Sequence, residues 1–150
     1  MSRPDLTWLR EAVGLGSLVD AVVTRTHPAR GLVEFTFDGG TLLASDPSVS
    51  IGTKVRLRIP AREVILATRE PEGLSLHNVL SGTVSAIHTD PAFDHVIVQI
   101  AVGRVLLLAE VTQDAIARLG IAVGMHVYAL IKSVSLDLLT VQASGATTAL

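Results

Sequence analysis

Apolar and polar residues alternate with a period of two along most of this chain. The alternation is plainest in Val33–Phe37 and Val55–Ile59, where apolar side chains fall on one side and polar side chains on the other. This period is typical of half-buried antiparallel strands. Between such stretches the sequence supplies residues that tight reversals need, as in Asp38-Gly39-Gly40 and Asp90-Pro91. The chain is therefore predicted to consist mostly of strands.

Two short segments have a different period and are predicted to be helices. In Pro4–Val13 the apolar residues recur every three to four positions and share one face. In the second segment, Thr112 can cap a helix that runs to Leu119, and Gly120 can end it. The apolar stripe of this second helix favours packing against a core.

The strand pattern occurs twice along the chain. The stretch from Leu18 to Leu66 is followed by a similar one from Leu80 to Leu138, and Gly52–Val64 aligns without gaps on Gly124–Leu136. Such a repeat indicates two copies of one small module. Several short strands with regular turns favour a small five-stranded barrel of the oligonucleotide/oligosaccharide-binding (OB) type. The predicted fold class is all-β: two tandem OB-like five-stranded barrels, with a short N-terminal helix and one short helix in the second barrel.

The repeat also predicts the domain boundaries. Residues 1–70 would form the first module and residues 71–150 the second, with Pro71-Glu72-Gly73 as a short hinge. The strand Glu63–Thr68 is expected to close the first barrel. The strands expected in the second barrel are Leu80–Ile87, Val96–Val102, Val105–Val111, His126–Ile131 and Val134–Val141. Each module alone would bury too small a core to be more than marginally stable, so the two are expected to pack together.

Composition excludes several classes of protein. Hydrophobic residues make up 49% of the chain, but no run approaches the roughly 18 apolar residues that a membrane-spanning helix needs. The absence of cysteine excludes disulfides and thiolate metal sites, and no leader segment is recognisable, so a cytoplasmic location is expected. The net charge of -2 provides no general attraction for anions, so any anion affinity must come from a local site.

Residue patterns typical of catalysis are nearly absent. No histidines have the i, i+4 spacing of a helical zinc pair, and no carboxylate pair stands out. The phosphate-binding pattern Gly-x-x-x-x-Gly-Lys-Ser/Thr does not occur. We therefore expect a binding protein rather than an enzyme, with no bound metal ion or organic cofactor. The five histidines are His27, His77, His88, His95 and His126.

Hydrogen-bond donors distinguish the second copy from the first. Lys132 and Ser133 occupy the positions where the first copy has Pro60 and Ala61, whose side chains cannot donate. A second donor-rich segment precedes the second copy and contains no acidic residue; its donors are Ser75, His77 and Asn78. Such donors suit an oxyanion. The alternatives are a solvated lysine at a strand edge and polar residues that fix a turn.

Three separated motifs of the second copy resemble the Mop (molybdate/tungstate-binding, TOBE-like) domain family. They are Ser75-x-His77-Asn78-Val-Leu-x-Gly82-x-Val84, Thr112-x-x-Ala115-x-x-x-Leu119-Gly120-x-x-x-Gly124 and Ala129-x-Ile131-Lys132-Ser133. The duplicated arrangement resembles the di-Mop region of molybdate-import ATPases of ABC transporters. In that family a degenerate first copy, with a strand like Ile59–Val64, precedes the second.

The resemblance implies a ligand, a site and partners. The ligand would be molybdate or tungstate, bound by Ser75, His77, Asn78, Ile131, Lys132 and Ser133, with the two segments meeting across a subunit interface. The implied partners are a second copy of the chain, an ABC-type ATP-binding domain and a transporter permease. His77 departs from the family pattern, which usually has arginine there, so a permanent charge is lost.

The function that the resemblance implies is a regulatory domain that senses molybdate for an import ATPase. Two other functions remain open at this point. A stand-alone molybdate storage protein of the molbindin kind would share the motifs and differ in its oligomeric state. A nucleic-acid-binding OB module would need a basic groove with stacking aromatics, whereas this chain has 3% aromatic residues and a slightly acidic balance.

Overall fold

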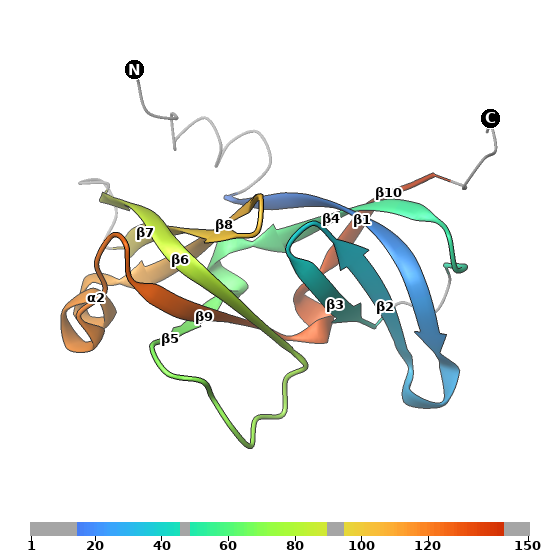
Figure 1. Cartoon of the computed structure of the whole chain (residues 1–150), viewed down its shortest axis with the longest axis horizontal. Coiled ribbons are helices and arrows are strands. Elements are labelled where there is room, and N and C mark those ends of the chain that lie inside the picture. Colours follow the sequence, from blue (N-terminus) through green and yellow to red (C-terminus); the bar gives the residue numbers. More distant parts are fainter. Residues whose placement is uncertain (1–14, 46–48, 90–94, 143–150) are drawn as a thin grey trace.

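The computed structural model describes residues 15–45, 49–89 and 95–142. They form two curled antiparallel sheets of five strands each, which lie beside one another in Figure 1. The expected all-β architecture of two OB-like barrels is confirmed. The expected helix Pro4–Val13 and the turn at Asp90-Pro91 lie outside the described residues.

In spatial order, the first sheet contains β10 (Asp137–Gln142), β4 (Lys54–Pro60), β1 (Gly16–His27), β2 (Leu32–Phe37) and β3 (Gly40–Ala44). The second contains β5 (Ile65–Ala67), β9 (His126–Ile131), β6 (Asn78–Thr89), β7 (His95–Val102) and β8 (Val105–Thr112).

The strands form where the sequence alternates. In β1, Val19, Ala21 and Val23 are buried while the intervening residues are exposed, as a period of two requires. The predicted helix is present as α2 (Gln113–Leu119). Its N-terminus is capped by Thr112, whose Oγ1 accepts a 3.0 Å hydrogen bond from the Ala115 amide.

The two copies match in backbone detail. Gly52 and Gly124 both have φ of 92°, in the region that favours glycine, and their amides donate 2.8 Å hydrogen bonds to the carbonyls of Val23 and Val84. The pairing register shifts directly after Val23 in β1 and directly after Val84 in β6. These matches confirm the repeat and fix which residues of the two copies correspond.

The strand that closes each barrel comes from the other copy. The strand β5 pairs with β9 in the second sheet, and β10 pairs with β4 in the first. The predictions that Glu63–Thr68 closes the first barrel and that Val134–Val141 belongs to the second were therefore wrong. The reason is a short 3-10 turn that follows β4 as Ala61–Glu63 and follows β9 as Ser133–Ser135 and leads the chain into the opposite sheet.

The barrels pack closely against each other. One continuous cluster of buried residues includes Phe35 and Leu57 of the first sheet and Ile100 and Val127 of the second. At two hairpin tips the backbones touch, because a Cβ added to Gly39 would lie 2.5 Å from the Val102 carbonyl oxygen. Within the described ranges, no helix has the length and apolar character needed to cross a membrane.

Candidate functional site

Sheet pairing brings the two donor-rich segments together. Strands β6 and β9 are antiparallel neighbours, with Asn78 opposite Ile131. Residues just before β6 and just after β9 must therefore lie at the same edge of the second sheet. Within one chain, the two segments thus leave neighbouring strands at the same end of the sheet. That they also meet across a subunit interface stays a prediction. In Figure 1 the segment that leads from β5 into β6 projects as a long loop below the sheets.

The six predicted residues differ in exposure. Asn78 is 3% exposed, Ile131 is fully buried and Ser133 is 8% exposed. Ser75, His77 and Lys132 have exposed side chains. The edge thus combines buried polar groups, whose positions are fixed, with exposed donors that can approach a ligand from solvent.

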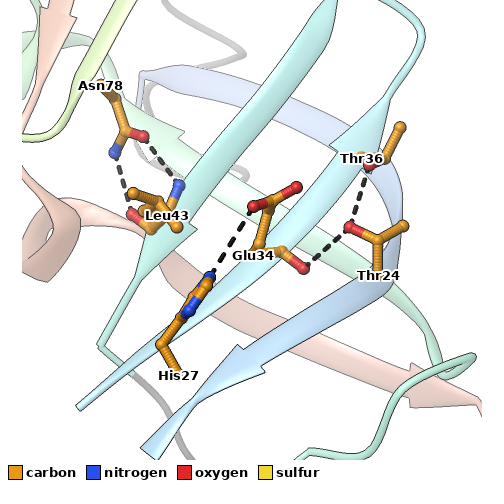
Figure 2. A network of polar contacts seen from close by, with 6 residues as sticks. All are labelled: Thr24, His27, Glu34, Thr36, Leu43 and Asn78. Carbon is orange, nitrogen blue, oxygen red and sulfur yellow. Dashed lines mark hydrogen bonds and ion pairs between the residues drawn. The ribbon is translucent and has the colours of Figure 1, made fainter. Parts of the chain in front are cut away.

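Asn78 is held by the first barrel. Its Oδ1 accepts a 2.7 Å hydrogen bond from the Leu43 amide, and its Nδ2 donates a 2.9 Å bond to the Leu43 carbonyl. Figure 2 shows both bonds reaching the backbone of β3. A carboxamide has two N–H groups, so one N–H of Asn78 is left over from this pair of bonds. Asn78 therefore links the start of β6 to β3, and its second N–H group is not used in these two bonds.

Ser133 is also held by the first barrel, through a residue that the sequence reasoning missed. Its Oγ lies 3.3 Å from the Oγ of Ser45, and the Ser45 amide donates a 3.4 Å bond to the Ser133 carbonyl. Ser45 directly follows β3 and has an exposed side chain. No pattern in the sequence marks it, because its importance comes from packing between the barrels.

The charges at this edge favour an anion. Neither 75–78 nor 131–133 contains an acidic residue, and Lys132 supplies a permanent positive charge. Lys132 forms no ion pair with any residue in the described part of the chain. Among those same residues, no group of three or more His, Asp or Glu side chains is placed to hold a metal ion. The arrangement offers N–H and O–H donors on a cationic edge, which is the chemistry that binds an oxyanion.

Comparison with known proteins points in the same direction. Residues 74–138 match the model of the TOBE domain. A molybdenum import ATP-binding protein of Granulibacter bethesdensis is 41% identical over 134 residues, which cover 83% of this chain and 35% of that protein. The corresponding protein of Methylococcus capsulatus is 35% identical over 91% of this chain and 38% of its own length. The chain thus spans little more than a third of these relatives.

A solved structure resembles the whole fold. It is a crystal structure of the cytoplasmic molybdate-binding protein ModG with molybdate bound. The likeness has a TM-score of 0.69 at 25% sequence identity, and covers 81% of this chain and 93% of ModG. The family resemblance predicted from the three motifs is confirmed.

Proposed function

Residues 74–138 belong to the TOBE domain family, and from this premise we propose that the chain binds molybdate at the shared edge of β6 and β9. The observation that supports the proposal is the pairing of Asn78 with Ile131, from which the two donor-rich segments continue at neighbouring strand ends.

The donor count matches the affinity that a sensor needs. A dissociation constant of 1 μM corresponds to about 8 kcal/mol. A hydrogen bond to a charged group contributes about 1.5–3 kcal/mol net, so about four donors are required. We assign this role to Ser75, His77, Lys132 and Ser133, with the remaining N–H of Asn78 as a fifth. Ile131 contributes through its backbone position rather than its side chain. Tungstate, with the same shape and charge, is the second expected ligand.

We propose that this binding serves regulation of molybdate import. The relatives from Granulibacter and Methylococcus are molybdenum import ATP-binding proteins, and this chain corresponds to little more than a third of each. In that setting the chain would act in the cytoplasm beside an ATP-binding domain and a transporter permease, as part of a homodimer. The chain itself would bind and report the anion and would catalyse no reaction. Residues 1–70 and 71–150 would be its two modules, each of which supplies one strand, β5 or β10, to the sheet of the other.

Molybdate storage is the second candidate function. It is favoured by the likeness to ModG, a molybdate-binding protein that this chain covers over 93% of its length. A storage protein would hold many anions in one oligomer, whereas a regulatory module would hold few in a dimer. Native mass measurement with and without molybdate separates the two: a trimer or hexamer favours storage, and a dimer favours regulation.

Titration calorimetry with sodium molybdate tests the binding itself. The chain has two lysines, Lys132 at the proposed site and Lys54 on β4 in the first barrel, which provide a matched pair. We expect Lys132→Ala to raise the dissociation constant by about tenfold or more and Lys54→Ala to leave it unchanged. No heat and no rise in melting temperature at millimolar molybdate or tungstate would refute the proposed function.

A further inference from the structure

The correspondence between the copies creates two equivalent contacts between the barrels. Ser17 stands at the same distance before Val23 as Asn78 stands before Val84, and Leu108 corresponds to Leu43 in the matching hairpin. The Leu108 amide donates a 2.9 Å hydrogen bond to the Ser17 Oγ. This bond is the counterpart of the bond from the Leu43 amide to Asn78. In each copy, the strand that follows the hairpin, β3 or β8, therefore contacts the other barrel through its backbone.

The two contacts differ in the side chains that lie two residues after Leu43 and Leu108. At the first, Ser45 lies against Ser133, so two hydroxyls meet. The corresponding residues at the second are Glu110 and Ala61, a carboxylate and a methyl group. The Glu110 side chain is only 14% exposed, and its Oε2 lies 2.5 Å from the Nδ1 of His95. A carboxylate repels an oxyanion and offers no donor to it.

We propose that Ser45 is a positioning residue that the first barrel supplies to the oxyanion site, and that each chain holds one oxyanion, at this contact alone. The inference rests on the proposed function. A hydroxyl carries one hydrogen and two lone pairs, so when Ser45 donates to the Ser133 Oγ, the hydrogen of Ser133 remains available for the ligand. Ser45 would thereby orient the buried Ser133 hydroxyl toward the anion.

The backbone supports the same role. The Ser45 amide holds the Ser133 carbonyl, and Asn78 holds Leu43 two residues earlier in the same strand region. The end of β3 is thereby fixed against both halves of the site. The first barrel lacks side-chain donors at Pro60 and Ala61, and its contribution is to complete the site of the second barrel.

The inference is tested by titrating the full chain and three variants with molybdate in a calorimeter. The variants are Ser45→Ala, Ser45→Thr and, as a matched control, Ser50→Ala, which changes another exposed serine of the first barrel. We expect Ser45→Ala to raise the dissociation constant by about tenfold. Ser45→Thr retains a hydroxyl and should restore most of the affinity, and Ser50→Ala should bind like the original chain. The stoichiometry should be one molybdate per chain in every variant that binds.

Each other outcome counts against the inference. If the original chain binds molybdate and Ser45→Ala binds equally well, the role of Ser45 is refuted while the proposed function stands. A weaker Ser45→Ala that also melts at a lower temperature without ligand, and that Ser45→Thr does not rescue, would show a purely structural role. Two molybdates per chain would refute the single site. If the original chain does not bind, the proposed function fails and this inference fails with it.

Discussion

The hydroxyl of Ser135 donates a 2.9 Å hydrogen bond to the carboxylate of Glu63, and the two residues occupy corresponding positions in the two copies. A bond between corresponding residues must lie close to the axis that relates the barrels, just as self-complementary contacts do in a two-fold dimer. The 3-10 turns that carry the chain between the barrels are thus fastened to each other.

Replacing Ser135 should weaken the packing between the barrels. Ser135 is 9% exposed and Glu63 is exposed, so the loss for Ser135→Ala should be about 1 kcal/mol in the free energy of unfolding. Urea denaturation of Ser135→Ala, Glu63→Ala and the double variant measures the coupling between the two side chains. Strict additivity of the two single effects would show that the bond does not contribute.

Replacing Asn78 should cost more. The variant Asn78→Ala removes two hydrogen bonds and leaves the amide and carbonyl of Leu43 without their partner, so we expect a loss of about 2–4 kcal/mol in the free energy of unfolding. The matched control is Ser17→Ala at the corresponding position, which removes one bond and should cost less. Equal losses in the two variants, measured by urea denaturation, would contradict the special role of Asn78.

Replacing His77 with arginine should strengthen binding. Arginine carries a permanent positive charge and offers a planar set of five N–H donors, more than the imidazole of a histidine can offer. We expect His77→Arg to lower the dissociation constant for molybdate severalfold.

The control for this change is His126→Arg, which adds the same charge at an exposed residue of β9. Titration calorimetry of both variants with molybdate provides the comparison. If His126→Arg strengthens binding as much as His77→Arg does, the effect reflects net charge rather than a contact with the anion.

Cutting the chain at the predicted boundary should unfold both halves. A fragment of residues 1–70 lacks β10, which pairs along β4, and a fragment of residues 71–150 lacks β5, which pairs along β9. We expect neither fragment alone to show a cooperative thermal transition, and the two mixed together to recover one. Circular dichroism melting measures this. A fragment that melts cooperatively on its own would show that its barrel does not depend on the exchanged strand.

Local sequence predicted the elements well and their partners poorly. The alternation in Val33–Phe37, the cap at Thr112 and the paired glycines Gly52 and Gly124 are short-range features, and each appears in the structure as expected. The exchange of β5 and β10 could not be predicted, because a period of two tells which side chains share a face and not which strand lies alongside.

The candidate site was predictable in part for the same reason. Lys132 and Ser133 stand out in the sequence because the first copy has Pro60 and Ala61 at the corresponding positions, and the donors in 75–78 stand out because no acidic residue lies among them. Their approach within one chain depends on the pairing of β6 with β9, and the presence of Ser45 beside Ser133 depends on how the barrels pack. Such long-range contacts leave no local pattern.

The exchange of β5 and β10 also has a consequence for synthesis on the ribosome. The first barrel needs residues 137–142, so it cannot be completed until nearly the whole described chain has been made, although its other four strands emerge early. Domains usually fold in the order in which they are translated. Here the earlier barrel has to wait with an open edge along β4 for the later one, and both reach their final form together.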